Sequence, residues 1–283
     1  MIQERIKREF KAIKLPEIFN EENRGYYRCC KTQLVLASES NDTWKSDITP
    51  SWIKLSDPAD SVQFVLKKCG EITNYIPTSN EFINEPNAFF TQIEWIDVLN
   101  SDGPGIYTLN IVANISGIPF DFQWGVYNLL EFSIENALYT ARIKAVFNSY
   151  HEIEGIDFTN SNVIGTFRFY GVIGSRQPNK QIDNIIFDDR QMSSVVRENL
   201  NIWELKTDPT NEEVTKIITD LYLLSENRLF ISDYNAHNHS YRINDIPVIL
   251  EETDELEYIE DTREAVLKAK FSDKFKDKRT YFK

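Results

Sequence analysis

The side chains best suited to metal chemistry lie in one short segment near the C-terminal end. His237 and His239 are two residues apart, and Asp233 precedes them. Two imidazoles at this spacing can face one side of a strand or loop, but a zinc site needs three or four ligands in a closed arrangement. No cysteine pair or glutamate motif joins these residues. We therefore expect no metal site, and the two imidazoles are better explained as loop side chains that bond backbone groups or face solvent.

Carboxylates are the second group that could do chemistry. They cluster at Glu251-Glu252, at residues 254–257 and at Glu260-Asp261. The spacing does not follow a calcium-binding EF-hand loop, so we expect an exposed charged edge that discourages unwanted strand pairing. A carboxylate pair for glycoside hydrolysis is an alternative, although nothing in the sequence singles out a pair. With no phosphate-binding loop, dinucleotide fingerprint, nucleophile elbow or HExxH motif, we expect no catalytic residues and no cofactor.

Composition limits the class of protein. The chain has 283 residues, of which 41% are hydrophobic and 13% aromatic, enough for one large or two small folded domains. A formal net charge of −13 argues against a nucleic-acid-binding surface, but it suits a surface that DNA passes without binding. The three cysteines include the adjacent Cys29-Cys30, which is a poor disulfide geometry, so we expect synthesis in a reducing cytoplasm. No apolar run is long enough for a membrane span.

Alternating apolar and polar residues predict strands. The alternation is clearest over residues 109–115, 120–126 and 139–147, where one face would meet a core and the other would face water. Such a pattern is typical of antiparallel sheets. Asp188-Asp189 lies between two apolar runs and predicts a hairpin. Residues 264–272 combine strand-like alternation with helix-like composition, and we interpret them as a strand.

Helices are few. Residues 2–13 repeat apolar side chains about once per turn until Pro16, which predicts a helix that packs on its own domain or an arm that docks on a neighbouring subunit. Asp208 and Pro209 begin a second helical pattern, with an apolar stripe from Val214 to Leu224 that would cover one face of a sheet. The Lys-rich residues 274–283 suggest a solvated tail, or a basic patch for a partner.

Together these patterns predict a mainly β protein of the α+β kind. We expect an antiparallel β-sandwich-like core with one flanking helix and an N-terminal helical extension. The extension or arm would span residues 1–60, and the β-rich core domain would span residues 61–283. A subdivision of the core near residues 150–160 is a further possibility.

One C-terminal segment resembles a known family. Residues 230–241 (FISDYNAHNHSY), with Pro247-Val248-Ile249 after them, are similar to a stretch in virion proteins of crAss-like bacteriophages, which infect gut Bacteroidetes. Residues 157–159 (DFT), 168–169 (RF) and 175–178 (SRQP) extend this likeness, which covers roughly residues 155–275. The first 150 residues carry no matching motif.

The resemblance implies a structural role in a short-tailed virion. It implies a ring, collar or adaptor subunit of the portal-proximal tail. By family analogy, twelve copies would surround the DNA exit channel. The expected partners are further copies of the chain, the portal protein and neighbouring tail rings, and genomic DNA would pass without specific binding. A carbohydrate- or receptor-binding β-sandwich of a tail fibre or adhesin is the alternative, because aromatic side chains in β proteins can stack on sugars.

Overall fold

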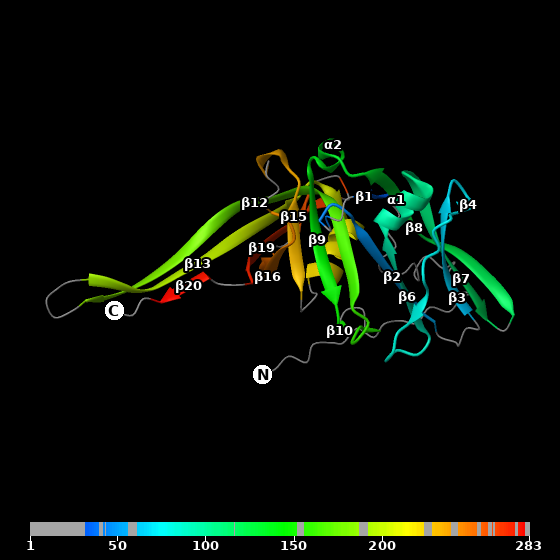
Figure 1. The fold of residues 1–283 in the computed structure, drawn as a ribbon, viewed down its shortest axis with the longest axis horizontal. Helices are drawn as coiled ribbons and strands as arrows, with labels where there is room; N and C mark the ends of the chain where they lie inside the picture. Colours follow the sequence, from blue (N-terminus) through cyan, green and yellow to red (C-terminus); the bar gives the residue numbers. More distant parts are fainter. Residues whose placement is uncertain are drawn as a thin grey trace.

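Strands make up most of the chain, and nearly all of them pair in antiparallel fashion (Figure 1). The structure is a computed structural model, and it describes residues 32–280 apart from residues 40–41, 43, 56–60, 116, 152–155, 187–191, 224–227, 239–242, 254–255, 260–261, 263 and 275–276. The prediction of a mainly β protein with antiparallel sheets is therefore confirmed. In the part of the chain that the structure describes, no helix is long and apolar enough to cross a bilayer.

The first sheet has five strands. In spatial order these are β1 (Gln33–Ala37), β8 (Ile118–Glu131), β7 (Gly105–Ile115), β3 (Ser61–Lys68) and β4 (Glu71–Ile72). All neighbours are antiparallel except β1 and β8, which run parallel. The predicted alternation holds on β7, where Leu109, Ile111 and Ala113 are fully buried. On β8 a bulge leaves Trp124 without an opposite residue, so the buried positions become Gly125, Tyr127 and Leu129.

A small sheet lies in the middle of the molecule, and its first strand buries side chains on both faces. It consists of β2 (Ile48–Lys54), β6 (Ala88–Glu94) and β5 (Asn80–Glu81). Successive strand residues point to opposite faces. Accordingly Trp52 joins the core of the C-terminal half, whereas its neighbour Ile53 joins the core of the five-stranded sheet. This middle sheet therefore ties the two halves together (Figure 1).

The C-terminal half is a closed ring of six antiparallel strands, which we call the barrel. In order around the ring they are β12 (Val163–Ile186), β9 (Thr140–Phe147), β15 (Leu229–Asp233), β16 (Ile246–Thr253), β19 (Lys268–Asp273) and β13 (Met192–Thr207). Pairing of β12 with β13 closes the ring. The predicted apolar face of β9 points inward, with Ala141, Ile143, Ala145 and Phe147 buried. Closure leaves this ring of strands without a terminal strand.

Shorter elements complete the chain. They are α1 (Trp95–Asp102), α2 (Ile134–Ala137), β10 (Tyr150–His151), β11 (Ile156–Asp157), β14 (Thr210–Asn211), α3 (Glu212–Lys216), the π-helical η3 (Ile217–Leu223), the 3-10 turn η4 (Ala236–Asn238), β17 (Glu257–Tyr258), β18 (Glu264–Val266) and β20 (Asp277–Thr280). Residues 264–272 are extended in β18 and β19, as predicted. Helix α1 was not anticipated from the sequence. Trp95 at its start is fully buried and donates its indole N–H to Thr49 Oγ1 at 2.8 Å.

The helical pattern after Asp208 is only partly as expected. The helix begins at Glu212, and Asn211 caps it by accepting a hydrogen bond from Val214 N at 3.2 Å. Residues 208–211 are not helical, because Asp208 N donates to the Tyr170 carbonyl and residues 210–211 pair with β18. From Ile217 the turns widen into a π-helix, whose Ile217, Ile218 and Leu221 are buried in the barrel core.

Residues 33–54 fall within the predicted N-terminal extension, but they supply β1 and β2 to the core sheets. The helix expected over residues 2–13 lies outside the described residues. Residues 150–160, the possible subdivision of the core, connect the barrel strands β9 and β12. The two halves meet earlier in the chain, between the end of β8 and the start of β9.

The predicted hairpin around Asp188-Asp189 is far longer than the sequence suggested. Ile186 pairs with Met192 near its tip, and the ladder continues down to Gly171 and Thr207 in the barrel. Residues 175–186 and 192–201 stand clear of the body as a long ribbon (Figure 1). The C-terminal end was expected to be a solvated tail, but residues 277–280 form β20 and pair with residues 196–199 of this ribbon. Below, "the ribbon" means these two stretches together with β20.

Candidate functional site

The histidine segment was the weak metal candidate, and the structure places only part of it. Asp233 ends β15 with its side chain buried, and His237 Nε2 lies 2.7 Å from Asp233 Oδ2. Asn235 donates its backbone N–H and its side-chain amide to Asp233 Oδ1, at 2.8 and 2.6 Å. His239 lies outside the described residues. Among the described residues, no group of three or more His, Cys, Asp or Glu is arranged to hold a metal ion.

The contacts of Asp233 shape a loop. Burial raises the pKa of the Asp233 carboxyl, and the bonds from Asn235 together with nearby His237 oppose that rise without cancelling it. An Asp that accepts from the backbone two residues later fixes a tight turn. The carboxylate therefore orders the start of the connection between β15 and β16.

A buried cluster of charged side chains joins the two halves of the molecule. Asp47, which precedes β2, accepts hydrogen bonds from Arg168 Nε at 2.8 Å and from Arg168 Nη2 at 3.0 Å. Leu36 N on β1 donates to the same carboxylate at 2.8 Å. Arg142 Nη1 lies 3.5 Å from Asp47 Oδ1. Asp47 thus links the five-stranded sheet to two strands of the barrel.

Asp245 is the second acid of this cluster. Arg142 Nη2 donates to Asp245 Oδ1 at 2.6 Å, and Lys144 Nζ lies 3.2 Å from Oδ2. Burial alone would raise the pKa of Asp245, but Arg142 and Lys144 outweigh it and hold that pKa below its usual value. Burial would likewise lower the pKa of Arg142, but Tyr234, Asp245 and Asp47 raise it. Both partners therefore stay charged at neutral pH.

Sequence reasoning missed this cluster. Alternation on residues 139–147 predicted that Arg142 and Lys144 face water, and they do lie on the outer face of the barrel. That face is covered, however, because Arg142 donates to the Ser46 carbonyl at 3.0 Å and to Asp245. The covering residues come from loops about one hundred positions away on either side. No local pattern in the sequence signals such a contact.

Aromatic packing beside the charged cluster strengthens the same junction. The rings of Trp44 and Tyr234 stack with centroids 6.1 Å apart, and Phe132 meets both rings. The Tyr234 hydroxyl donates to the Trp44 carbonyl. The Arg168 guanidinium lies 4.4 Å from the centre of the Tyr234 ring, within the range of a cation–π interaction. Tyr234 belongs to the segment that carries the phage resemblance, and its contacts here are those of a structural residue.

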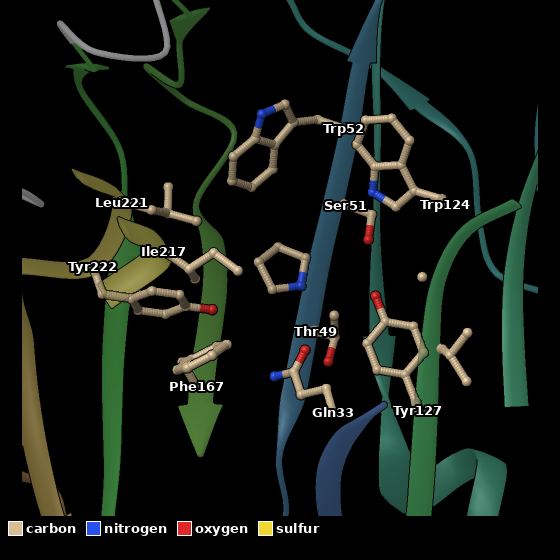
Figure 2. A pocket seen from close by; sticks show the side chains of 13 residues that line it. Gln33, Thr49, Ser51, Trp52, Trp124, Tyr127, Phe167, Ile217, Leu221 and Tyr222 are labelled. Carbon is tan, nitrogen blue, oxygen red and sulfur yellow. The ribbon is translucent and has the colours of Figure 1, made fainter. Parts of the chain in front are cut away.

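A small cavity lies where the middle sheet, the five-stranded sheet and the barrel meet (Figure 2). Its volume is about 50 Å³. The lining residues labelled in Figure 2 come from the five elements β1, β2, β8, β12 and η3: Gln33, Thr49, Ser51, Trp52, Trp124, Tyr127, Phe167, Ile217, Leu221 and Tyr222. Ligand pockets usually measure at least about 300 Å³, so this space suits one or two water molecules better than a sugar ring.

Tyr222 is the polar group that projects into this cavity from the helical side (Figure 2). Its hydroxyl donates to the Thr166 carbonyl at 3.1 Å. Burial raises the pKa of Tyr222, so the hydroxyl stays protonated and keeps its role as donor. This hydrogen bond gives a partner to a backbone carbonyl on the edge of β12 that does not pair with β9.

A second cavity, of about 250 Å³, lies beside the same edge of β12. It is lined by residues at the start of β1, on β9 and β12, and in the stretch 208–214: Thr32, Gln33, Leu34, Thr140, Phe167, Arg168, Phe169, Tyr170, Asp208, Pro209, Thr210 and Val214. Arg168 is the one Lys or Arg in this lining, and its guanidinium already binds Asp47 and Thr140. The lining therefore has no Lys or Arg side chain left to bind a negatively charged ligand.

The alternative of a carbohydrate-binding β-sandwich requires aromatic side chains that can stack on sugars, and tryptophan is the largest of these. Trp203 is buried in the barrel core, and its indole N–H donates to Asp273 Oδ1 at 2.8 Å. Trp95 and Trp52 are also buried, whereas Trp124 is partly exposed. A buried indole packs within the core and cannot stack on a sugar.

Asp273 on β19 anchors the base of the ribbon. Besides the Trp203 indole, it accepts hydrogen bonds from Asn201 N at 3.3 Å and from the Asn201 side-chain amide. Trp203 and Asn201 lie on β13 at the point where this strand leaves the barrel. One carboxylate therefore fixes the direction in which the ribbon departs.

The ribbon itself leaves one edge open. In the part of the chain that the structure describes, residues 177–186 of β12 pair only with β13. Strand β9 pairs with β12 only from Val163 to Tyr170, so it does not reach these residues. At roughly 3.3 Å per residue, the 12 residues 175–186 span about 40 Å. Pro178 lacks an N–H and blunts this edge at one position. The residues beyond Pro178 keep the donors and acceptors of an open strand.

The acidic runs lie at the end of β16 and just beyond it. Glu251, Glu252 and Glu257 are exposed, as the sequence indicated. Lys270 Nζ lies 2.9 Å from Glu252, and Lys268 Nζ lies 2.7 Å from Glu257. Exposed pairs of this kind contribute little to stability, and they leave most of the acidic character of the surface in place.

Comparison with known protein families finds no family model that matches this chain, and no curated protein matches it.

Proposed function

We propose that this chain is a structural subunit of a bacteriophage virion, a ring, collar or adaptor protein of the portal-proximal tail. The observation that carries the proposal is the ribbon, which leaves the barrel and ends beyond the rest of the body (Figure 1). Two long strands joined over a few residues by the short β20 have no core of their own, and such a hairpin is marginally stable alone in water. Such an element is suited to contact with another subunit, where its open edge and faces become covered.

The distribution of surfaces favours a ring. The ribbon lies at one end of the long axis, and the five-stranded sheet lies at the other (Figure 1). A closed ring uses two different patches on each subunit, and the patch at one end meets the patch at the opposite end of the next copy. The resemblance of residues 230–241 to crAss-like phage virion proteins adds the setting, a ring around the DNA exit channel.

Several finer assignments belong to the same proposal. The protein acts in the virion tail after synthesis in the host cytoplasm, without enzymatic activity or a cofactor. Its partners are copies of itself, twelve by family analogy, together with the portal protein or a neighbouring tail ring. The five-stranded sheet and the middle sheet share one core, which supports a sandwich-like description of that half. The segment from α3 to η3 would be the helix that flanks the barrel.

Electron microscopy of the purified chain, alone and mixed with a portal protein, tests this function. We expect closed rings of uniform diameter, in the purified chain or on the portal. A chain that stays monomeric in both samples at micromolar concentration would contradict the proposal. Mass photometry of the same samples gives the number of copies per ring from the chain mass of 33.1 kDa.

A further inference from the structure

The larger cavity, of about 250 Å³, is bordered by two strand edges that have no partner strand among the described residues. Strand β1 is the terminal strand of the five-stranded sheet, so only its edge beside β8 is paired. Strand β12 pairs with β9 from Val163 to Tyr170 and with β13 from Gly171 onward. Leu34 of β1 and Arg168 of β12 both line this cavity, which we call the slot.

The backbone of Leu34 points away from β8. Two residues further along β1, Leu36 N donates to Asp47 Oδ2 and the Leu36 carbonyl accepts from Asp47 N, both at 2.8 Å. Leu36 therefore presents its N–H and C=O on the edge of β1 that β8 does not occupy. Backbone direction alternates along a strand, so Leu34 presents its own N–H and C=O on that same edge. Neither group bonds to another described residue.

The backbone of Arg168 is open in the same way on β12. Gly171 N donates to the Tyr139 carbonyl at 3.0 Å, on the side of β9. Antiparallel pairs alternate, so Phe169 also bonds toward β9 and Arg168 presents its N–H and C=O on the opposite edge. In the described part of the chain these two groups of Arg168 have no hydrogen-bond partner.

Short pieces of chain cover this edge of β12 on both sides of Arg168. The Thr166 carbonyl accepts from the Tyr222 hydroxyl at 3.1 Å, and the Tyr170 carbonyl accepts from Asp208 N at 3.0 Å. Backbone groups that lie away from water are normally paired, because an unpaired group costs free energy. The slot is therefore an interruption in the cover of this edge.

Asp47 shows which chemistry fits between these two strands. It occupies the position beside Leu36, where its backbone N–H bonds β1 and its carboxylate binds the Arg168 guanidinium of β12. A stretch of extended polypeptide carries N–H and C=O groups on both of its edges, so it can pair with Leu34 on one side and with Arg168 on the other. About three residues of such a stretch span roughly 10 Å. The apolar side chains of Phe167, Phe169 and Val214 in the lining suit an uncharged segment.

Residues 1–31 of the chain can supply this segment. They lie outside the described residues, and they join the described part at Thr32, which itself lines the slot. At about 3.3 Å per residue, 31 residues can reach roughly 100 Å, which is far enough to enter a neighbouring copy. A segment of the same copy must reverse its direction before it can lie beside β1, whereas a segment of another copy needs no reversal.

We propose that the slot binds an extended stretch of residues 1–31 donated by a neighbouring copy. The stretch adds a strand between β1 and β12 and pairs with the backbone of Leu34 and Arg168. The proposal rests on the proposed ring function and names a contact that joins one subunit to the next. The donated segment and the slot are different patches of one subunit, as a head-to-tail contact requires.

Photo-cross-linking of the full chain tests the slot. Tyr170 lines the slot and its side chain is exposed, so p-benzoylphenylalanine can replace it without filling the slot. Light and heavy isotope-labelled copies are mixed before assembly, irradiated, digested and analysed by mass spectrometry. We expect links from position 170 to residues 1–31 of a differently labelled copy. The control places the same amino acid at Tyr258, an exposed tyrosine of β17 outside the slot, and should give no such links.

Filling the slot is an independent test. Val214→Trp adds an indole to the lining, and Val65→Trp makes the same change at a half-buried position of β3 away from the slot. Mass photometry over a concentration series measures self-association. We expect Val214→Trp to lose at least about tenfold in association constant and Val65→Trp less than about threefold. Thermal unfolding checks that both variants fold, and the cross-links from position 170 decide the matter if Val214→Trp does not fold.

The outcomes separate the slot from the ring. Rings in which position 170 links only within its own copy, or never to residues 1–31, would overturn the slot and leave the ring function standing. A folded Val214→Trp variant that assembles like the wild type would do the same. Links between copies in assemblies that are not closed rings would support the slot and overturn the ring. A chain that never self-associates, alone or with a portal protein, would overturn both.

Discussion

Arg168 holds Asp47 through two hydrogen bonds, Nε to Oδ2 at 2.8 Å and Nη2 to Oδ1 at 3.0 Å, although 121 residues separate them in the chain. Both side chains are almost completely buried. The pair connects the residues before β2 to strand β12 of the barrel, so it fixes how the two halves sit together. A buried two-bond contact of this kind depends on both partners, because either charge alone would be strongly disfavoured.

Removal of one partner should therefore be costly. We expect Asp47→Ala to reduce the free energy of unfolding by about 3–5 kcal/mol, because it leaves Arg168 buried without its carboxylate. Urea denaturation followed by fluorescence measures the change. The control is Lys67→Ala, which breaks a more exposed pair with Asp121 and should cost at most about 1 kcal/mol. Equal costs for the two variants would show that the buried pair does not hold the halves together.

The contribution of Asp245 to the free energy of unfolding should depend on pH in the acid range. Its pKa is lowered in the folded state because Arg142 and Lys144 outweigh the effect of burial. A lowered pKa stabilises the fold above the unfolded value of about 3.9, and this stabilisation disappears as the pH falls through the folded pKa. We expect the stability difference between wild type and Asp245→Asn to be constant near neutral pH and to shrink below about pH 4. Urea titrations across this range measure it.

Asp233 serves as a control, because its contribution to stability should change with pH in the opposite direction to that of Asp245. Burial raises its pKa in the folded state, so the folded protein holds this proton more tightly than the unfolded chain. The contribution of Asp233 to stability should therefore fall as the pH rises above about 4. If both Asn variants showed the same pH trend, the assigned environment of at least one of these carboxylates would be incorrect.

Gly171 should be sensitive to a single added methyl group. Here β12 leaves β9 and begins to pair with β13, with φ of +149°. A Cβ at this position would lie 2.5 Å from the Lys206 carbonyl oxygen. We expect Gly171→Ala to cost about 3 kcal/mol or more, because backbone must move to make room. Gly174→Ala is the matched control, since its Cβ would meet Glu204 O at an ordinary 3.7 Å. Thermal unfolding of both variants measures the difference.

The anchor at the base of the ribbon gives a local prediction. Asp273→Ala removes the acceptor for the Trp203 indole and for Asn201. Hydrogen exchange should speed up in residues 192–201, whereas β9 and β15 in the barrel should keep their protection. Uniformly faster exchange across the barrel would mean that Asp273 supports the whole sheet and has no particular role at the ribbon.

Much of the strand pattern could be predicted from the sequence. Residues 139–147 alternate strictly, and the buried side chains of β9 are the predicted ones, because one face of that strand meets a single continuous core. On β8 the same reasoning gave the wrong face after Trp124, because a bulge shifts the alternation by one residue. Bulges depend on the partner strand, and a single strand's sequence does not reveal them.

Closure of the barrel and the buried charges could not be predicted in this way. The ring closes because β12 exchanges its partner β9 for β13 at Gly171, a pairing between residues more than thirty positions apart. Arg142 looks like a solvent-facing residue of an alternating strand until the loops around Ser46 and Asp245 fold over it. The C-terminal residues 277–280 read as part of a solvated tail, but they pair with β13 as β20. In each case a long-range contact decides the role of a locally ordinary residue.

The central claim is that this chain works by joining copies of itself into a closed assembly. The most direct test is mass photometry of the purified full-length chain across a concentration series, with electron microscopy of the same samples. We expect one discrete oligomer whose images are closed rings, in equilibrium with the 33.1 kDa monomer. A single monomeric species at every concentration, with and without a portal protein, would contradict it.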